Sequence, residues 1–306
     1  MNDQEFKEKY DKLKNSKFYQ QKMFGWRPLP TISCITIIFV CFAIFFIIMG
    51  IIILVFTAQV KEIKTRYDIC EKYSTTEPYP CIVHININED MKKPIMIYYQ
   101  VDGVVQNHRF YMDSKSEKQL KGENPSDDDL KKDCEGALYI KDILWQKKTD
   151  NSDTDLANPC GLIAKTFFND KFTHWKIEGE SDEIDFEKEE EDKENIAYQS
   201  DIDTYKEIAK NKDCGEHFLV WMRPSPFSNP RKLWGRINQD IKQNSQLTVH
   251  IKLNYYASKK YIILSTRNIF GGKSMFLGIC YIIAGGMSLM ASVIFITTYS
   301  SFHRKK

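Results

Sequence analysis

Residues 32–56 read ISCITIIFVCFAIFFIIMGIIILVF, a run of 25 residues without a charged side chain. At about 1.5 Å of rise per residue, a helix of this length crosses a hydrocarbon core of about 30 Å with some tilt. A buried core helix is the alternative, but core helices rarely run this long without a polar face. The stretch therefore predicts a membrane-spanning helix at Ile32–Phe56.

A second uncharged stretch, Ser274–Tyr299, lies near the other end of the chain. Two spans place both tails on one side of the membrane and the chain between them on the other. The predicted segments are a tail at 1–31, a span at 32–56, a domain at 57–273, a span at 274–299 and a stub at 300–306. About thirty mostly polar residues precede the first span, so a cleaved signal peptide is not expected.

The tails are more basic than the domain between the spans. Residues 1–31 and 274–306 together carry ten Lys or Arg and four Asp or Glu, a net of +6. The whole chain has 43 and 41, so 33 and 37 remain for residues 57–273, a net of −4. Basic tails favour the cytosol, although the residues immediately flanking the spans are about equally basic on both sides. We therefore expect cytosolic termini and a lumenal or extracellular domain.

Cysteine usage supports this placement of the domain. Five cysteines lie between the spans, namely Cys70, Cys81, Cys134, Cys160 and Cys214. Five thiols suit an oxidising lumen, with two disulfides and one thiol left over. Zinc is the alternative, but no C-x-x-C pair occurs and the histidines of this region are scattered singly. We expect two disulfides and no metal.

Strand signals dominate the domain. Apolar residues alternate at Cys81–Asn88, Pro94–Val101 and Leu247–Tyr256. The short link at 91–93 predicts that the first two strands form an antiparallel hairpin, and Tyr261–Thr266 is expected to return beside the third. The fold class is therefore a membrane protein of two helices flanking a mainly antiparallel β domain (α+β) with two disulfides.

Weaker signals fill the rest of the domain. Strands are expected at His108–Met112 and His217–Arg223, and a helix is expected from Asn229-Pro230 through Gln243. Lys121–Asp133 is polar and predicts a surface loop. The acidic run Glu178–Glu194 predicts a solvated insertion rather than a calcium site, because it lacks the alternating Asp, Asn and Gly of a calcium loop.

Small residues recur every four positions in the second span, at Ala284, Ser288 and Ser292. Such residues let another helix approach closely in lipid. We therefore expect these three residues to bind a partner helix, for which the first span is itself a candidate.

The segment Asn158-Pro159-Cys160-Gly161-Leu162-Ile163-Ala164, with Phe168-Asn169-Asp170 after it, closely resembles the hallmark of one family. This is the cell cycle control protein 50 family, also called the ligand-effect modulator 3 family. Supporting stretches occur in the family's order, namely Trp26-Arg27-Pro28, Gln106-Asn107-His108-Arg109, Val220-Trp221-Met222-Arg223 and Gly271-Gly272-Lys273. The resemblance runs from about residue 18 to 300.

The resemblance implies a non-catalytic subunit of a type IV P-type ATPase, a phospholipid flippase. Such subunits form heterodimers with the ATPase, accompany it out of the endoplasmic reticulum and support its transport cycle there, in the Golgi or endosomes, or at the plasma membrane. The family's disulfides imply the pairs Cys70–Cys81 and Cys134–Cys160, and leave Cys214 without a counterpart. The chain departs from the family in its acidic insertion and in having no Asn-x-Ser/Thr glycosylation site.

Trp26, Arg27 and Pro28 lie just before the first span. Tryptophan favours the membrane interface, so anchoring among lipid headgroups is one role for this stretch. Docking on the partner is the other, because Arg27 can hold a carboxylate through two parallel hydrogen bonds. We expect these residues to bind the partner.

The residues contain no catalytic constellation, and no cofactor, metal or nucleic acid is expected. The partners expected are the ATPase and membrane lipids. A two-span channel subunit with a disulfide-bonded ectodomain is the alternative function, but its spans would line a pore with polar residues. These spans offer only hydroxyls, small residues and cysteines. A membrane-tethered enzyme comes third.

Overall fold

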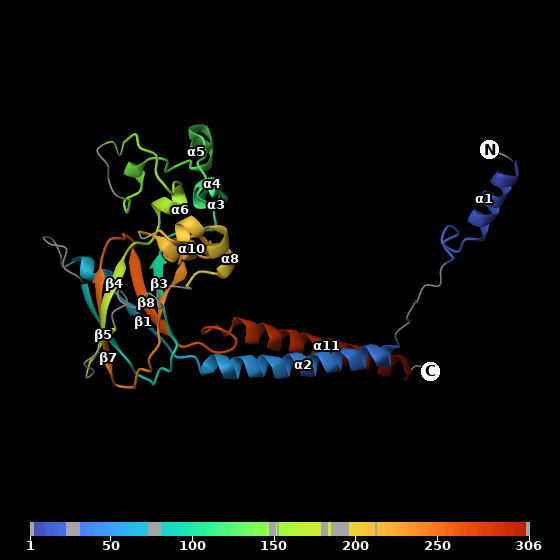
Figure 1. The fold of residues 1–306 in the computed structure, drawn as a ribbon. Coiled ribbons are helices and arrows are strands. Elements are labelled where there is room, and N and C mark those ends of the chain that lie inside the picture. Colours follow the sequence, from blue (N-terminus) through green and yellow to red (C-terminus); the bar gives the residue numbers. More distant parts are fainter. Residues whose placement is uncertain are drawn as a thin grey trace. The chain divides into compact units, whose positions relative to one another are not determined.

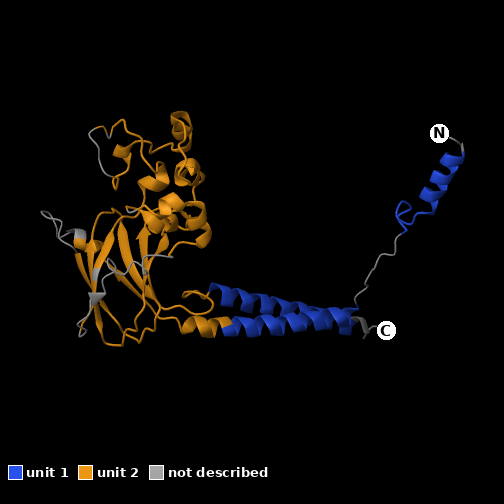
Figure 2. Ribbon diagram, viewed as in Figure 1, with its two compact units in different colours: residues 1–52, 276–306 blue, residues 53–275 orange. Residues whose placement is uncertain are grey.

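The computed structural model describes residues 3–22, 31–72, 81–146, 151, 153–178, 183–184, 196–211 and 213–303. It divides into two compact units, one of Met1–Ile52 with Phe276–Lys306 and one of Ile53–Met275 (Figure 2). The first unit holds most of both long apolar helices, and the second holds the β-rich domain.

The two long helices are α2 (Ile32–Ala58) and α11 (Phe276–His303), which run antiparallel beside each other (Figure 1). Both are long and apolar enough to cross a membrane, and most of their apolar side chains are exposed. This exposure excludes a buried core helix and suits lipid. The structure therefore has a candidate membrane-spanning helix at each of the two predicted spans. A short helix, α1 (Asp3–Asn15), precedes them.

Two four-stranded antiparallel sheets build the second unit. One has the order β1-β8-β3-β6 and the other β2-β7-β4-β5. The strands are β1 (Glu62–Arg66), β2 (Cys81–Asn86), β3 (Ile95–Asp102), β4 (Lys171–Ile177), β5 (Glu183–Ile184), β6 (Arg231–Ile237), β7 (Gln246–Lys252) and β8 (Lys259–Ser265). The predicted fold class is confirmed, including its two disulfides.

Aromatic side chains fill the space between the sheets. The ring of Trp234 on β6 lies 5.1 Å from Phe172 and 6.2 Å from Trp175, both on β4 of the other sheet. These rings are at most 7% exposed. Because β4 and β6 belong to different sheets, these contacts form the core that holds the sheets together.

The strands were placed correctly, but their predicted pairing was wrong. β2 pairs with β7 while β3 pairs with β6 and β8, so the expected hairpin does not form. β7 and β8 likewise lie in different sheets. The link after β2 crosses between the sheets instead, and there Met91 and Ile241 exchange two backbone hydrogen bonds of 2.9 Å. Alternation shows that a strand has one buried face, but it does not identify the neighbouring strand.

Three weaker predictions were also wrong. The expected strand at His108–Met112 is helix α3 (Arg109–Asp113), and that at His217–Arg223 is helix α10 (Gly215–Met222). The expected helix after Pro230 is strand β6, in which Lys232 and Trp234 are buried and Arg231 and Leu233 are half-buried. A short apolar run cannot separate a buried helix from a strand by periodicity alone.

Short helices gather beside one end of the sheets (Figure 1). Besides α3 and α10, these are α4 (Glu117–Leu120), α5 (Asp127–Asp133), α6 (Leu162–Lys165), α8 (Gln199–Thr204) and α9 (Lys206–Ala209), with the 3-10 turn η2 (Ile140–Asp142). Another 3-10 turn, η1 (Asp68–Lys72), follows β1. The predicted loop at Lys121–Asp133 therefore ends in helix α5, whose first turn is capped by the Ser126 hydroxyl accepting from Asp129 N–H. Most of Glu178–Glu194 lies outside the described residues.

Candidate partner-binding site

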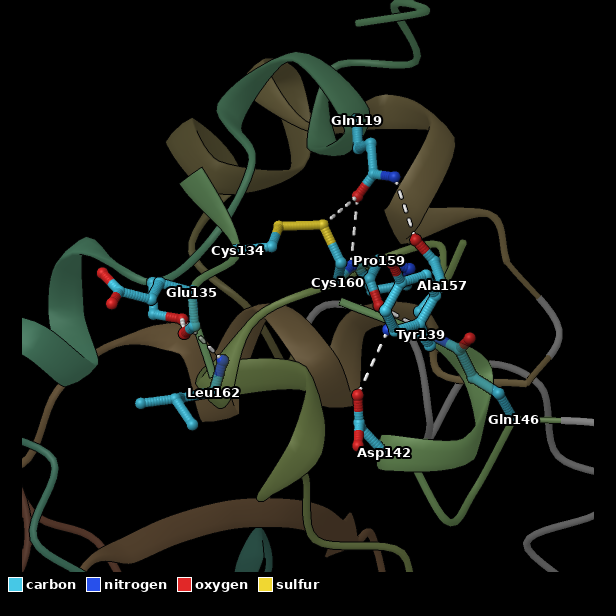
Figure 3. The surroundings of a disulfide bond; sticks show 11 residues. Gln119, Cys134, Glu135, Tyr139, Asp142, Gln146, Ala157, Pro159, Cys160 and Leu162 are labelled. Carbon is cyan, nitrogen blue, oxygen red and sulfur yellow. Dashed lines mark hydrogen bonds between the residues drawn. A yellow bond between two sulfur atoms is a disulfide. The ribbon is translucent and has the colours of Figure 1, made fainter. Parts of the chain in front are cut away.

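The disulfide Cys134–Cys160 is the centre of the helical layer (Figure 3). The buried side chain of Gln119 from α4 lies beside this disulfide. Its Oε1 accepts from the Cys160 backbone N–H (3.1 Å), and its Nε2 donates to the Ala157 carbonyl (3.0 Å). This amide therefore fixes the backbone of the family motif on both sides of Pro159, whose own carbonyl accepts from Gln146 (2.8 Å).

Gly161 in this motif cannot be replaced without distortion. Its φ of 99° is in the left-handed region, and a Cβ there would lie 2.2 Å from the Ser114 carbonyl oxygen. Its N–H donates to the Ala137 carbonyl (2.7 Å). The Ser114 hydroxyl donates to the Glu135 carbonyl (2.7 Å) and accepts from the Leu162 N–H (2.9 Å). The motif Asn158–Gly161 thus joins the loop before α4 and the segment after α5 to the start of α6.

The second disulfide, Cys70–Cys81, joins η1 to the start of β2. It therefore links chain that follows β1 of one sheet to a strand of the other. The two bridges span sequence separations of 11 and 26 residues. Loops of these lengths stabilise a fold by about 3 kcal/mol each on the chain-entropy estimate. The structure contains the pairs that the resemblance implied, and Cys214 stays a buried thiol whose pKa burial raises to about 12.

Asp170, the last residue of the family motif, is fully buried and has four partners. Its Oδ1 accepts from the backbone N–H groups of Asn254 (2.6 Å) and Tyr255 (2.7 Å). Its Oδ2 accepts from the Tyr67 hydroxyl (3.0 Å) and lies 3.1 Å from Lys260 Nζ. Both side chains of this ion pair are 0% exposed. A buried carboxylate persists only where donors surround it in this way.

These partners come from both sheets. Tyr67 follows β1 and Lys260 lies in β8, whereas Asp170 directly precedes β4 and Asn254 follows β7. Lys260 Nζ also donates to the Tyr255 carbonyl (2.7 Å). We call these residues the Asp170 cluster, and it fastens the two sheets at one end. For Asn169, the described contact is its carbonyl, which accepts from Asn254 (3.1 Å).

The loops at 103–108 and 223–230 are hydrogen-bonded to each other. Buried Gln106 accepts from the Ser225 N–H (3.0 Å), and Asn107 donates to the Pro226 carbonyl (2.8 Å). This pairing leaves apolar side chains outside, with Val105 51% and Phe227 71% exposed. Both exposed side chains stand on backbone that these hydrogen bonds fix, and we call the exposed side chains of the two loops the loop-pair surface.

Arg223 borders the loop-pair surface. It makes a two-pronged ion pair with Asp201, with N···O distances of 2.6 and 3.0 Å, and stacks 3.8 Å from the centre of the exposed Tyr198 ring. The hydrogen bonds to Asp201 raise the pKa of Arg223. Its carbonyl accepts from the buried ammonium of Lys232. Burial, with the Arg223 charge second, lowers the pKa of Lys232 to about 8.

The two long helices meet at small residues. A Cβ on Gly50 of α2 would lie 2.7 Å from Ile282 Cγ1, and a Cβ on Gly285 of α11 would lie 2.7 Å from Ile47 Cγ1 and 3.2 Å from the Ala43 carbonyl. The buried small residues recur every seven positions, at Ala43 and Gly50 on α2 and at Gly278, Gly285 and Ser292 on α11. The first span is therefore a partner of the second.

The three small residues expected to bind a partner helix differ in their surroundings. Ser292 is 2% exposed, whereas Ala284 and Ser288 are half-buried. The Ser288 hydroxyl donates to the Ala284 carbonyl (2.9 Å), within its own helix. A role for these residues toward another protein stays a prediction. Trp26, Arg27 and Pro28 lie outside the described residues, so their role stays a prediction as well.

Sequence reasoning missed the residues that support the motif, namely Tyr67, Ser114, Gln119 and Lys260. Their partners are distant in sequence, and Lys260 lies in a strand whose other buried residues are apolar or small. The seven-residue spacing of glycines in the second span was the one signal that could have been read. Within the described ranges, no group of three or more His, Cys, Asp or Glu could hold a metal ion.

Comparison with known proteins agrees with this architecture. The profile of the LEM3 (ligand-effect modulator 3) family / CDC50 family matches residues 53–305. The chain is 31% identical to the putative ALA-interacting subunit 2 of Arabidopsis thaliana, over 91% of this chain and 85% of that protein. It is 28% identical to cell cycle control protein 50A of Bos taurus, over 92% and 87%. It is 27% identical to the phospholipid-transporting ATPase accessory subunit LEM3 of Saccharomyces cerevisiae, over 95% and 84%.

Proposed function

Because this chain belongs to the LEM3 (ligand-effect modulator 3) family / CDC50 family, we propose that it is a non-catalytic accessory subunit of a phospholipid-transporting ATPase of the type IV P-type class. The observation that carries the proposal is the family match across both the domain and the second span. The name of the yeast relative supports the same role, and the similarity to it covers 95% of this chain.

The architecture suits a subunit that stabilises a partner. The domain is held by two disulfides, by the aromatic core between the sheets and by the buried Asp170 cluster. A rigid domain loses little conformational entropy when it binds. An accessory chain that binds the folded ATPase and not its unfolded form stabilises it by mass action. If its contacts differ between transport states, it also shifts the populations of those states.

The cellular role follows from this stabilisation. The subunit accompanies the ATPase out of the endoplasmic reticulum as a heterodimer, and it supports phospholipid translocation in the membrane where the complex resides. Both termini lie in the cytosol, and the disulfide-bonded domain lies on the opposite side, where oxidation is possible. The stretch Trp26-Arg27-Pro28 then faces the cytosolic side of the ATPase.

The loop-pair surface is the contact that we assign to the ATPase on the other side of the membrane. Exposed aromatic and apolar side chains on a fixed backbone, bordered by an arginine, have the composition of interface hot spots. Replacing Phe227 by serine is expected to lower the yield of the complex at least several-fold. Leu144→Ser is the matched control, because Leu144 is 79% exposed but lies outside this surface. Equal losses in the two variants would remove the assignment.

The experiment that tests the function is purification of the tagged chain in mild detergent, followed by identification of the proteins that accompany it. We expect a P-type ATPase in near-equal amount. Cells that lack the chain should retain that ATPase in the endoplasmic reticulum and lose uptake of fluorescent phospholipid. Normal uptake and ATPase location, in cells without a second member of the family, would refute the proposal. An ion current from the purified chain alone would favour a channel subunit instead.

A further inference from the structure

The loop between β8 and α11 forms a tight hairpin with an apolar tip. Asn268 and Gly271 exchange two backbone hydrogen bonds of 3.0 Å, so Ile269 and Phe270 occupy the tip. Their side chains are 87% and 46% exposed. Gly271 takes a φ of 103°, which the turn requires and other residues rarely adopt.

This hairpin is fixed to the end of the first span. The Asn268 side-chain amide donates to the Phe56 carbonyl (2.7 Å), and the Phe56 and Phe270 rings lie 5.7 Å apart, edge to face. Phe56 is the last residue of the uncharged run Ile32–Phe56, and the last turn of α2 belongs to the same compact unit as the hairpin (Figure 2). The tip is therefore held at the level where the apolar span ends.

The hairpin backbone is suited to a medium with little water. Of the four N–H groups in residues 268–271, three donate within the hairpin, since Phe270 N–H also donates to Asn268 Oδ1 (2.9 Å). The Phe56 carbonyl, at the end of α2, accepts from the Gln59 backbone N–H (3.2 Å) as well as from Asn268. Satisfied backbone groups are the main requirement for chain that enters the edge of a bilayer.

Charged residues flank the tip on both sides. Arg267 and Lys273 are exposed. The uncharged stretch that leads into α11 begins directly after Lys273. In a bilayer the apolar acyl chains lie beneath the anionic phosphates. An apolar tip between two cations fits this arrangement, with the tip at the acyl chains and the cations at the phosphates. A protein partner would not require an apolar tip to be flanked by two basic residues.

We propose that Ile269 and Phe270 insert into the leaflet on the domain's side of the membrane, as a lipid anchor fixed to the end of the first span. The occupant of this surface is membrane lipid, with Arg267 and Lys273 at the phosphates. The anchor holds the end of β8 and the end of the first span against the bilayer together. The inference rests on the two spans and not on the identity of the ATPase.

Photocrosslinking of the full chain in phosphatidylcholine nanodiscs tests the anchor. A benzophenone side chain is placed at 269, at 270 or, as the control, at 256, and the nanodiscs contain an alkyne-tagged phosphatidylcholine. Tyr256 is 90% exposed but precedes β8, so the length of that strand, about 20 Å, separates it from the hairpin. Non-reducing peptide mapping selects preparations with both disulfides intact.

We expect lipid adducts at 269 and 270 to exceed those at 256 at least five-fold. Adduct yields at both hairpin positions equal to the yield at 256 would show that the tip lies in water, and would overturn the proposal. Two test positions guard against a single variant that fails to fold. Because no ATPase is present in the nanodiscs, this outcome is independent of the proposed function.

Discussion

Replacing Lys260 with methionine removes one partner of the buried ion pair and leaves the Asp170 carboxylate in place. Removing one member of a buried pair costs about 3–5 kcal/mol, because the remaining charge is uncompensated. Here Asp170 keeps three donors, the Tyr67 hydroxyl and the N–H groups of Asn254 and Tyr255. We therefore expect a loss at the lower end, about 3 kcal/mol.

The opposite change is expected to cost more. Asp170→Ala removes the acceptor that these three donors share and the carboxylate partner of the buried Lys260 ammonium. The expected loss is about 5 kcal/mol. For a domain of this size, 1 kcal/mol shifts Tm by about 2–4 °C. Lys260→Met should thus lower Tm by about 6–12 °C and Asp170→Ala by about 10–20 °C.

The assay is thermal unfolding of the full chain in detergent, followed by the fluorescence of tryptophans such as Trp175, which is 0% exposed. Lys259→Met is the matched control, because Lys259 is exposed on the same strand and its replacement should change stability by less than about 0.5 kcal/mol. In the double variant Asp170→Ala/Lys260→Met, the loss should be smaller than the sum of the two. Strictly additive losses, or single losses equal to the control, would refute the reasoning.

The remaining predictions concern the spans, a buried lysine and the tail. Gly285→Leu should force the two spans apart, and spin–spin distances measured between the ends of the two helices would detect this change. Gly286→Leu should leave these distances unchanged, because nothing lies within 4 Å of a Cβ at that position. Unchanged distances in both variants would contradict the packing. The Lys232 pKa of about 8 lies below the unfolded value of 10.5, so the unfolded chain binds more protons between these values and stability rises with pH. The rise should reach about 2 kcal/mol by about pH 9.5 and vanish in Lys232→Met, and equal pH profiles of Tm would exclude it. Arg27→Ala should weaken co-purification with the ATPase without altering membrane insertion, and a normal yield of complex would leave that stretch only an anchoring role.

The sequence predicted elements that depend on local pattern. The spans at 32–56 and 274–299 required only length and the absence of charge, and the strand at Leu247–Tyr256 required only alternation. Both signals come from neighbouring residues. The structure has a long apolar helix at each predicted span, and it has strand β7 over the first six residues of the predicted strand. Helix α10 was predicted as a strand because its eight residues are too few and too apolar to distinguish the helical period of 3.6 residues from the strand period of 2.

Pairing and side-chain networks could not be predicted in the same way. In each sheet, strands that are far apart in the chain lie beside each other. For example, Glu62 of β1 pairs with Ser265 of β8. The Asp170 cluster likewise joins residues that no spacing rule relates. The family resemblance pointed to Asn158–Gly161 and to Asp170 as residues of interest, but their supporting partners become visible only in three dimensions.

The pairing of β1 with β8 also determines the order of events during synthesis. β1 is the first strand after the first span and β8 is the last before the second, and β3 is flanked by β6 and β8, both made later. At about 5–20 residues per second, a ribosome needs about 10–30 s to proceed from β3 to β8. Until β6 is made, β3 has neither of its neighbouring strands, and its other edge stays exposed until β8 follows. The domain therefore completes the pairs of β8 with β1 and with β3 only when the chain directly before the second span has been made.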